Sequence, residues 1–413
     1  MPRSRLYPPS VRPGIPKLGP CPPGWRTVKL RDLFDVMSRP AELMPDQRYQ
    51  LVTVKRSRGG VVAREELRGD EIKTPTQFYV KEGDFVISRR QIIHGACGFV
   101  PAELDGAVVS NEYDVLRPRP ELVPGFLREL VHTEYLQRTF FQSSVGVDVE
   151  KMVFDLEFWL QYELTLPHPT EQQSIAESLA DADVAIEAAV FAAQQARRAK
   201  RAVVQGMMSR QKDWEVKTVG ELVSHGPQNG LSPSANRHGT IKTFSIGAVR
   251  EGRVDIEEHL KWVDVSESEQ AKYQLFDGDI LVVRGNANAD LVGTCGLIGT
   301  APQRCIYPDL LIRVRPSTSM LDVVFMEFFN ADSTRAQIGR IAKTTNGTLK
   351  INGEDLVSIR LPLPPPDVQI TLAEALCACR KVIDHYDSLC GHLTRLKTAL
   401  QQSLLSGRLR VKV

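Results

Sequence analysis

Two stretches of sequence, sampled at alternating steps of four and three residues, carry the same pattern 197 positions apart. The first selects Ile175, Leu179, Ala182, Ile186, Ala189, Ala193, Ala196, Lys200, Val203 and Met207. The second selects Leu372, Leu376, Cys379, Ile383, Tyr386, Cys390, Leu393, Lys397, Leu400 and Leu404. This spacing places side chains along one face of a helix and is typical of a coiled-coil seam. The two stretches therefore predict a pair of long helices.

The two seams differ in the size of their side chains. The first is rich in alanine where the second carries Tyr386 and Leu393, and small side chains opposite large ones let two helices approach closely. This difference favours pairing of the two helices inside one chain; two amphipathic helices, each packed on its own domain, are the alternative. From Ile175 to Met207 the first helix would extend roughly 50 Å at 1.5 Å per residue, which predicts a rigid spacer. The seam residues expected at the helix contact are Ile175, Leu179, Ile186, Lys200, Leu376, Ile383, Tyr386 and Lys397.

Shorter motifs recur at a similar period, so the chain consists of two copies of one plan. The openings at Trp25 and Trp214 lie 189 positions apart. The turns Glu82-Gly83-Asp84 and Asp277-Gly278-Asp279, which are 195 apart, each precede an apolar strand that ends in arginine. Each copy then contains an Arg-Pro pair and a proline-marked lead into its long helix: Arg117-Pro118 and Arg315-Pro316, then Leu166-Pro167-His168-Pro169 and Leu361-Pro362-Leu363-Pro364.

The repeat predicts an α+β fold in five segments. Turn-bounded apolar runs between the long helices predict strands at 50–54, 85–87, 280–283 and 310–314, and shorter helices are expected over 121–142 and 321–343. The leader is proline-rich, with four basic and no acidic side chains, which is typical of a disordered arm. The expected segments are the leader 1–23, a first globular domain 24–165, a first spacer helix 166–212, a second globular domain 213–360, and a second spacer helix with a tail 361–413.

Composition limits the class of protein. A length of 413 residues predicts about two or three domains, and 42% hydrophobic with 25% charged residues is typical of a soluble globular chain. The 52 basic and 50 acidic residues nearly balance, which excludes a polycationic wrapper but leaves room for local basic faces. We expect a cytoplasmic protein, because no run of residues has the length and apolarity of a membrane span and no secretory signal opens the chain. Seven scattered cysteines are expected to be reduced thiols.

Several kinds of enzyme are excluded by missing motifs. Glycine is never followed by lysine, so no phosphate-binding GxxxxGK[ST] loop exists, and HExxH, GxSxG and GxGxxG are also missing. Cys377 and Cys379 are two apart on a helix and point away from each other, so we interpret them as buried thiols and not metal ligands. His94 lies close to Cys97, but no third group that would orient a nucleophilic pair is nearby. The sequence therefore predicts no catalytic residue, no metal site and no cofactor in this chain.

Basic and amide side chains cluster in both copies, at 55–60 and 88–91 in the first and at 284–288 and 343–350 in the second. Arginine and amide side chains pair with guanine and adenine edges in the major groove, whereas lysine, hydroxyl and backbone N–H groups hold phosphates. One basic loop is weak evidence, but recurrence at equivalent places favours nucleic-acid binding. The candidate DNA-binding residues are Lys55, Arg56, Arg58, Arg89, Arg90, Gln91, His94, Arg284, Asn286, Asn288, Lys343, Thr345, Asn346 and Lys350.

These candidates divide into two expected roles. Base readers are expected among Arg89, Arg90, Gln91, Arg284, Asn286 and Asn288. Phosphate contacts are expected from Lys55, Arg56, Lys343 and Lys350. In the alternative interpretation, Arg89 and Arg284 are braces, each paired with a carboxylate inside its own domain.

Together these residues resemble the DNA-specificity subunit of type I restriction-modification systems. The resemblance rests on the Trp openings, the Glu/Asp-Gly-Asp turns, the Leu-Pro leads and the closing 404–410 stretch, and it covers nearly the whole chain. Two further phrases also look typical of its target recognition domains: 106–113, Gly-Ala-Val-Val-Ser-Asn-Glu-Tyr, and 143–148, Ser-Ser-Val-Gly-Val-Asp. The leader 1–23, the alanine-rich first helix and its Leu-Pro-His-Pro lead depart from the family's pattern.

The resemblance implies a protein without catalysis of its own. Its two recognition domains would each read one half of a split double-stranded DNA site, held apart by two antiparallel helices that dock two modification subunits and the restriction or translocase subunits. S-Adenosylmethionine, ATP and Mg²⁺ would then belong to those partners, and no membrane is involved. A self-contained nucleic-acid-modifying enzyme with an unrecognised active site and a structural coiled-coil adaptor that never touches DNA are the two alternatives.

A lysine stands at the same seam position in both helices, at Lys200 and Lys397. A charge in an apolar seam costs stability, but it fixes the helix register or extends its amine to a partner. Replacing both lysines with leucine is therefore expected to raise the melting temperature and to loosen register or assembly. In the alternative interpretation the two lysines lie on an exposed stripe and contact DNA.

Overall fold

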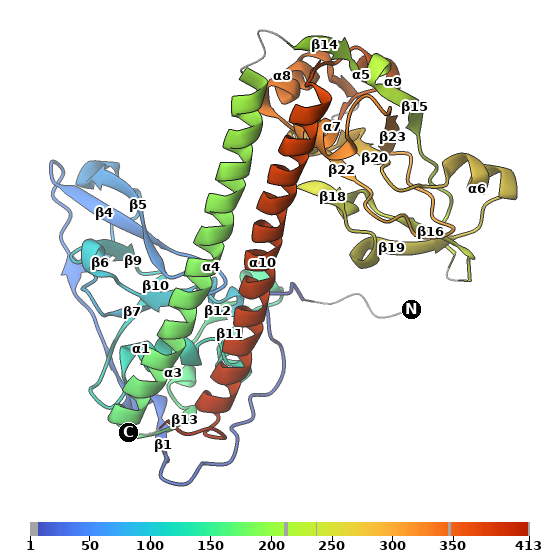
Figure 1. The fold of residues 1–413 in the computed structure, drawn as a ribbon. Coiled ribbons are helices and arrows are strands. Elements are labelled where there is room, and N and C mark those ends of the chain that lie inside the picture. Colours follow the sequence, from blue (N-terminus) through green and yellow to red (C-terminus); the bar gives the residue numbers. More distant parts are fainter. Residues whose placement is uncertain (1–6, 210–213, 237, 346–347, 412–413) are drawn as a thin grey trace. The chain divides into compact units, whose positions relative to one another are not determined.

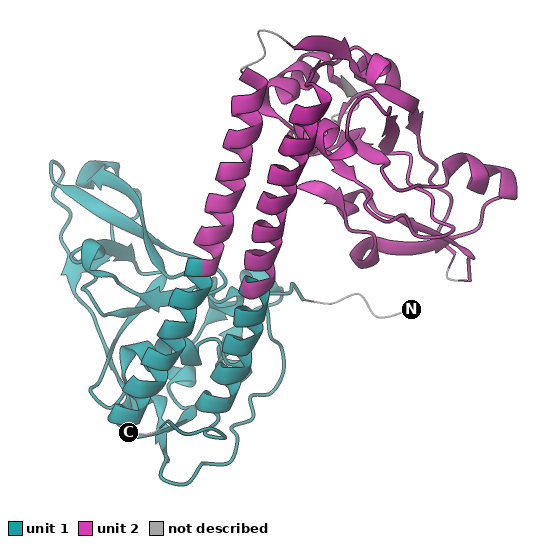
Figure 2. Ribbon diagram, viewed as in Figure 1, with its two compact units in different colours: residues 1–188, 390–413 teal, residues 189–389 magenta. Residues whose placement is uncertain are grey.

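The computed structural model describes residues 7–209, 214–236, 238–345 and 348–411. The chain divides into two compact units, unit 1 (residues 1–188 and 390–413) and unit 2 (residues 189–389), drawn in teal and magenta in Figure 2. Both units combine sheets and helices (Figure 1). The helices α4 (Pro169–Ser209) and α10 (Pro366–Leu405) each contribute one part to each unit. The predicted α+β fold, with a long helix between two domains, is confirmed.

Unit 1 contains a four-stranded sheet with the order β2-β10-β7-β8 and a five-stranded sheet with the order β3-β6-β9-β4-β5. Its short helices are α1 (Pro124–Leu130), α2 (Glu134–Gln142) and α3 (Leu156–Trp159), with 3-10 turns η1 (Leu30–Asp32), η2 (Gly69–Glu71), η3 (Ile92–His94), η4 (Ala102–Leu104) and η5 (Val149–Lys151). Its strands are β1 (Arg26–Lys29), β2 (Phe34–Val36), β3 (Pro40–Ala41), β4 (Arg48–Val54), β5 (Val61–Arg68), β6 (Gln77–Tyr79), β7 (Phe85–Ser88), β8 (Cys97–Phe99), β9 (Val108–Ser110), β10 (Tyr113–Pro118), β11 (Ser144–Val145), β12 (Val153–Phe154) and β13 (Glu163–Leu166).

Unit 2 contains a six-stranded sheet with the order β15-β23-β20-β22-β18-β17 and a three-stranded sheet with the order β21-β25-β24. Its short helices are α5 (Val219–Leu222), α6 (Glu267–Tyr273), α7 (Asp322–Phe329), α8 (Asp332–Ile341) and α9 (Gly353–Val357), with 3-10 turns η6 (Ile246–Ala248), η7 (Glu257–His259) and η8 (Ala289–Leu291). Its strands are β14 (Glu215–Thr218), β15 (Val223–Asn229), β16 (Ile241–Phe244), β17 (Val249–Arg250), β18 (Gly252–Val254), β19 (Leu260–Val263), β20 (Ile280–Val283), β21 (Gly285–Asn286), β22 (Cys295–Leu297), β23 (Leu311–Pro316), β24 (Lys343–Thr345), β25 (Thr348–Lys350) and β26 (Arg360–Leu363).

The two units share one frame. The strands β2-β10-β7-β8 of unit 1 correspond to β15-β23-β20-β22 of unit 2, and the pair β1-β13 corresponds to β14-β26. Each of the four predicted strands coincides with an observed strand to within two residues at its start. The two helices predicted over 121–142 and 321–343 are each observed as two, α1 with α2 and α7 with α8. In unit 1 the break occurs where Thr133 caps α2 by accepting a hydrogen bond from the Leu136 N–H.

A buried ion pair links two of the repeated motifs in each unit. Asp84 and Asp279, from the two Gly-Asp turns, are completely buried. The Arg117 guanidinium lies 2.7 Å from the Asp84 carboxylate, and the Arg315 guanidinium lies 2.7 Å from that of Asp279. Both arginines come from the Arg-Pro pairs. Because a buried carboxylate requires a charged or hydrogen-bonding partner, these arginines stabilise the buried aspartate of each unit. In unit 1, Arg39 lies 2.6 Å from the same Asp84 carboxylate.

A buried glutamine fixes the start of each long helix. Gln172 in unit 1 accepts a hydrogen bond from the Val123 N–H at 2.9 Å and donates to the Pro167 carbonyl at 3.0 Å. Gln369 in unit 2 accepts from the Leu321 N–H at 2.8 Å and donates to the Pro364 carbonyl at 2.9 Å.

These glutamines correct the alignment of the proline leads. The helices begin at Pro169 and Pro366, so the segment equivalent to Leu166-Pro167-His168-Pro169 is 363–366. The segment 361–364 predicted from the sequence starts two residues too early, because residues 361–364 contain the same Leu-Pro pair twice.

Within each unit, the segments of α4 and α10 run antiparallel. In unit 1, Ile175 and Leu179 share a core with Leu404, and the side chain of Asp183 meets that of Lys397 at 2.6 Å. In unit 2 the contacts show the same antiparallel order. There Val204 shares a core with Leu372 and Leu376, and Arg197 meets Asp387 at 2.7 Å.

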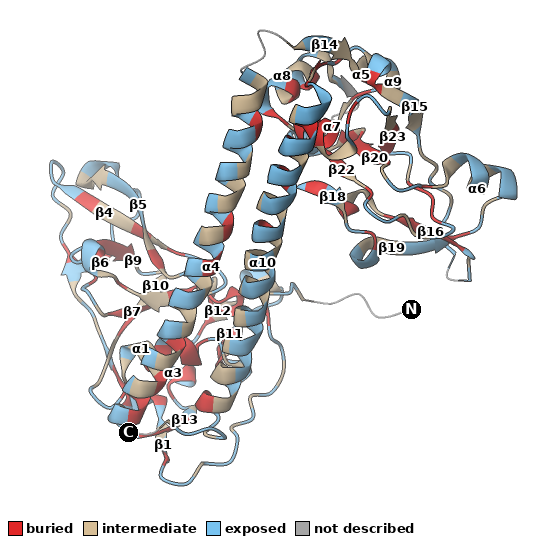
Figure 3. Ribbon diagram, viewed as in Figure 1, coloured by how far each residue is buried: buried red, intermediate tan, exposed pale blue. Residues whose placement is uncertain are grey.

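Figure 3 shows buried residues in red and half-buried residues in tan along both long helices. The eight residues expected at the helix contact are all buried or half-buried. Val203 differs from the predicted pattern, because it is 36% exposed while its neighbour Val204 is 4% exposed. An α-helix has 3.6 residues per turn, so a strict four-three pattern drifts around the helix and misses the buried face near its end.

Each seam lysine binds a buried glutamate of a short helix in its own unit. The Lys200 amine lies 2.6 Å from the Glu327 carboxylate on α7. The Lys397 amine lies 3.6 Å from the Glu129 carboxylate on α1 and 2.6 Å from that of Asp183. Both glutamates are at most 7% exposed. The structure thus reverses the expectation for leucine at these positions, because leucine would leave a buried carboxylate without its cation.

Candidate nucleic-acid interface

The two basic clusters of unit 1 lie together. The first cluster is the turn between β4 and β5, and the second follows β7. The Arg56 Nε donates to the Gln91 side-chain oxygen at 2.6 Å, and the backbone N–H groups of Ser57 and Arg58 donate to the carbonyls of His94 and Gly95, both at 2.7 Å. These contacts join candidate residues that are more than thirty positions apart in the chain.

The turn that carries Arg58 has an uncommon backbone. Ser57 and Arg58 both have positive φ, at 57° and 61°, in the left-handed region that favours glycine. Two such residues match the tight hairpin turn that usually contains Asn-Gly. The two hydrogen bonds to the segment after β7 hold this less favourable backbone in place, and such strain collects at functional sites.

The two arginines among the candidate base readers of unit 1 lie next to carboxylates. Arg90 forms a two-pronged contact with the Glu112 carboxylate, at 2.5 and 3.1 Å. Arg89 lies 3.8 Å from the Asp114 carboxylate on β10. Burial raises the pKa of Asp114 to about 6, and the nearby Arg89 cation opposes that rise. The Arg89 contact agrees with the brace interpretation, whereas more than half of the Arg90 side chain is exposed and within reach of a ligand.

His94 is placed differently from the other candidates. Its side chain is 1% exposed, so it does not contact a ligand in this conformation. Its Nδ1 is hydrogen-bonded to the Ser10 hydroxyl at 2.9 Å, and its Nε2 faces the Glu150 carboxylate at 3.3 Å. Burial lowers the pKa of His94, and the Arg56 cation lowers it further, whereas Glu150 raises it. His94 therefore has a structural role beneath the two basic clusters of unit 1.

The two clusters of unit 2 also lie together, in the three-stranded sheet. β21 of the 284–288 cluster pairs with β25, and β25 pairs with β24 of the 343–350 cluster. Lys350 is thereby opposite both Gly285 and Lys343. The Arg284 guanidinium donates to the Asp309 carbonyl at 3.4 Å and, among the described residues, has no carboxylate within ion-pair distance. This sheet places two lysines and one arginine next to the Asn286 turn.

The asparagines of unit 2 shape their own turn. The Asn286 side-chain oxygen accepts from the Asn288 N–H at 2.9 Å, and the Asn288 oxygen accepts from the Asp290 N–H at 3.0 Å. Their oxygens are used by the backbone, and this leaves the side-chain N–H groups as donors toward a ligand. Of the remaining candidates, Asn346 lies outside the described residues, and only the backbone of Thr345, in β24, is described.

One backbone contact is common to both interfaces. The Phe154 N–H donates to the Arg89 carbonyl at 2.9 Å in unit 1, and the Ile351 N–H donates to the Arg284 carbonyl at 2.9 Å in unit 2. This bond joins the arginine at the strand end to the β-hairpin that follows the short helices, β11-β12 or β24-β25. Sequence reasoning missed Glu150 in the first hairpin, which binds Arg56 at 2.9 Å. Glu150 lies in the hairpin of unit 1 that corresponds to the 343–350 cluster of unit 2, and this correspondence is the signal that would have identified it.

Other chemistry finds no support within the described ranges. No group of three or more His, Cys, Asp or Glu side chains there is arranged to hold a metal ion. Burial raises the pKa of the Cys97 thiol to about 12, so it is not a nucleophile at neutral pH. No helix among the described residues has both the length and the apolarity to span a membrane.

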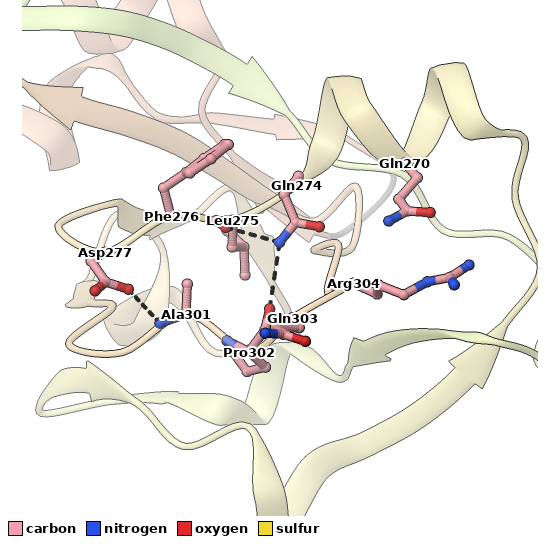
Figure 4. A pocket seen from close by; sticks show the side chains of 9 residues that line it. All are labelled: Gln270, Gln274, Leu275, Phe276, Asp277, Ala301, Pro302, Gln303 and Arg304. Atoms are coloured by element: carbon pink, nitrogen blue, oxygen red, sulfur yellow. Dashed lines mark hydrogen bonds between the residues drawn. The ribbon is translucent and has the colours of Figure 1, made fainter.

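A shallow hollow of about 770 Å³ in unit 2 is lined by none of the candidate residues. Figure 4 shows that the Gln274 amide is turned toward the carbonyls of Leu275 and Pro302, at 3.0 and 3.4 Å. The Asp277 carboxylate accepts from the Ala301 N–H at 2.8 Å. These polar groups are used by the protein itself, and the hollow adds nothing to the interface.

Comparison with known proteins identifies chains that are similar to this one. The sequence profile of a type I restriction modification DNA specificity domain matches residues 211–384. The chain is 27% identical over 316 residues to the type I restriction enzyme EcoKI specificity subunit of Escherichia coli (strain K12), a match that covers 72% of this chain and 67% of that protein. Residues 211–384 therefore match the type I restriction modification DNA specificity domain family, and the chain is similar to one of its specificity subunits.

Two solved structures share the fold of this chain. One, described as "Structural basis underlying complex assembly and conformational transition of the type I R-M system", has a TM-score of 0.55 at 18% identity and covers 95% of this chain and 100% of its own. The other is the type I restriction-modification system S subunit from M. genitalium, with a TM-score of 0.55 at 13% identity, covering 95% and 99%. At these identities the likeness concerns the fold alone.

Proposed function

We propose that this chain is the non-catalytic recognition and assembly subunit of a type I restriction-modification complex. Unit 1 and unit 2 each read one half of a split double-stranded DNA site. The helices α4 and α10 set the gap between the halves and dock two modification subunits and the restriction or translocase subunits. Those partners supply S-adenosylmethionine, ATP and Mg²⁺ and perform methyl transfer, cleavage and translocation.

The observation that carries this proposal is the repetition of the interface. In both units an arginine ends a central strand, a polar turn follows it, and the same backbone hydrogen bond at 2.9 Å attaches a hairpin beside them. A single basic turn is common on protein surfaces, but two equivalent ones attached in the same way point to two copies of one binding function. Base contacts from such turns give sequence specificity, and the lysines nearby hold the phosphate backbone.

The polar groups suggest which bases are read. Arg90 presents a planar fork that matches the O6 and N7 acceptors of guanine, and it would exchange Glu112 for the base. The Asn286 side-chain N–H can donate to N7 of adenine, and the second lone pair of its oxygen, which already accepts from the Asn288 N–H, can accept from N6. We therefore assign a guanine position in one half-site to Arg90 and an adenine position in the other half-site to Asn286.

The test is a binding panel with the subunit bound to its modification partner. The duplexes carry every single-base change in both half-sites of the motif that is found by sequencing methylated DNA from cells with the complete system. Arg90→Ala should cost about 1 to 3 kcal/mol and relax one guanine position, and Asn286→Ala should relax one adenine position in the other half. An even loss across the panel, or relaxation in the same half-site, would overturn the assignment.

Two controls sharpen the panel. Arg90→Ala also uncovers the Glu112 carboxylate, so the double variant Arg90→Ala/Glu112→Ala separates loss of the base contact from repulsion by that carboxylate. Both variants should relax the same base position. Lys343→Ala should instead weaken all duplexes alike and lower the salt slope by about one. Methylation or cleavage by the purified chain without partners would favour a self-contained enzyme.

A further inference from the structure

The leader, expected to be disordered, carries several contacts with unit 1. The Tyr7 ring meets the Phe141 ring edge-on, with centroids 5.5 Å apart. The Val11 side chain is 3% exposed. The Gly14 carbonyl accepts from the Gln142 side-chain amide at 3.1 Å. Together with the bond from Ser10 to His94, these contacts hold residues 7–14 against α2 and η3.

Arg12 is the charged residue of this held segment, and it is exposed. Val11 before it is buried and Gly14 after it is bound, so the backbone of Arg12 is fixed on both sides. Its guanidinium donates to the carbonyls of Pro9 and Val11 within its own segment. Among the described residues, no carboxylate lies within ion-pair distance of Arg12 or of Arg58.

The surroundings of Arg12 are positive. Ser10 is bonded to His94, whose backbone carbonyl accepts from the Ser57 N–H, so the segment with Arg12 lies beside the Arg58 turn. Burial lowers the pKa of Arg58, Cys97 raises it, and the charge of Arg12 lowers it. Arg56 adds a third cation, and Glu150 is the acidic group that faces it. Two neighbouring guanidiniums that share no carboxylate are stabilised by an external anion. The spacing of phosphates along a nucleic-acid backbone provides such anions in a row.

We propose that the N-terminal segment 7–14 completes the DNA-binding surface of unit 1, with Arg12 contacting a backbone phosphate next to the Arg58 turn. The contact positions the duplex and reads no base. Ser10 and Val11 fix the segment, and the hydrogen bond from Ser10 attaches it to His94, which is buried beneath the two basic clusters. This inference rests on the proposed function, because it assumes that unit 1 binds DNA.

The test measures the salt dependence of binding by the full chain with its modification partner. The probes are a duplex with the methylated motif and one of scrambled sequence, from 0.05 to 0.2 M NaCl. Loss of one phosphate contact lowers the slope of log K against log salt by about 0.9. Arg12→Ala should therefore bind both duplexes more weakly, by a factor that shrinks roughly 3.5-fold across this range. Arg12→Lys should restore the slope, because a phosphate contact needs a point charge and not a fork.

Control variants distinguish a phosphate contact by Arg12 from a purely structural role of the segment 7–14. Arg31→Ala removes an exposed cation on η1, outside both clusters, and should leave the slope unchanged. Val11→Asp should release the segment and lower the slope as Arg12→Ala does, with unit 1 still folded by circular dichroism. A wild-type slope for Arg12→Ala, while the wild-type complex still prefers the motif duplex, would overturn the role of the segment. If the wild-type complex shows no preference, the proposed function fails instead.

Discussion

Replacing Lys200 with methionine is expected to destabilise unit 2, although a lysine in an apolar helix seam looks unfavourable from the sequence. The Lys200 amine is 2.6 Å from the Glu327 carboxylate, and the exposed fractions of the two side chains are 16% and 8%. Methionine keeps most of the side-chain volume but removes the charge. The Glu327 carboxylate then stays buried with Arg380 at 3.6 Å as its remaining cation.

The size of this effect can be worked out from these contacts. Removing one partner of a buried ion pair costs about 3 to 5 kcal/mol. Arg380 keeps part of the compensation, and Lys200 retains some contact with water, so we expect a loss of about 2 to 3 kcal/mol. For a unit of this size, such a loss lowers the melting temperature by roughly 5 to 10 °C.

A double-mutant cycle identifies the cause. Glu327→Gln removes the buried charge, and in the Lys200→Met/Glu327→Gln variant no orphaned carboxylate remains. The double variant should therefore be less destabilised than the sum of the two single variants, by about 1.5 kcal/mol or more. Urea unfolding followed by tryptophan fluorescence gives the free energies, and hydrogen exchange of α7 assigns the transition to unit 2. Equal or greater stability of Lys200→Met, or additivity in the cycle, would refute the reasoning.

Two further predictions concern unit 1 and the long helices. The pKa of Asp114 is about 6, above its ordinary 3.8, so its contribution to stability is complete below about pH 4 and is lost as the pH rises through 6. Asp114→Asn should therefore gain up to about 3 kcal/mol relative to wild type between pH 4 and 7.5, measured by urea unfolding, and a pH-independent difference would contradict this. Inserting four residues after Ala193 adds roughly 6 Å and about one turn to α4. The methylated motif should then show a wider gap between its half-sites, or DNA binding should be lost. An unchanged gap would show that the helices do not set the distance between the half-sites.

Elements with a periodic or punctuated pattern could be predicted from the sequence. The seams gave both long helices, because their apolar positions repeat at the period of the helix itself. The strands β7 and β20 were marked by apolar runs after Gly-Asp turns. The breaks between α1 and α2 and between α7 and α8 were missed, because a helix cap such as Thr133 leaves only one weak signal in a continuous amphipathic pattern.

Partners in long-range contacts could not be predicted in the same way. Asp84 and Arg117 were each visible as part of a repeated motif, but no local period connects residues 33 positions apart. Glu327 and Glu129 gave no signal as partners of the seam lysines, because charged residues on short helices are usually solvated. The candidate interface shows the same limit. The clusters were found by composition, whereas the contact of Arg90 with Glu112 and the covering of His94 by Ser10 depend on folding.

The contacts that the two units share differ in kind from those that they do not share. The Asp-Arg pair, the helix-start glutamine, the seam lysine with its glutamate, and the backbone bond to the strand-end arginine occur in both units, and each lies in the interior or on the backbone. The β4-β5 turn with Arg58 and the N-terminal segment occur in unit 1, whereas the Asn286 turn occurs in unit 2, and these carry the exposed polar groups. A shared frame of this kind keeps the position of the interface constant while the groups that face the ligand change. Under the proposed function, the two units therefore read different half-sites from equivalent positions, and substitutions in the frame should affect stability in preference to the sequence that is read.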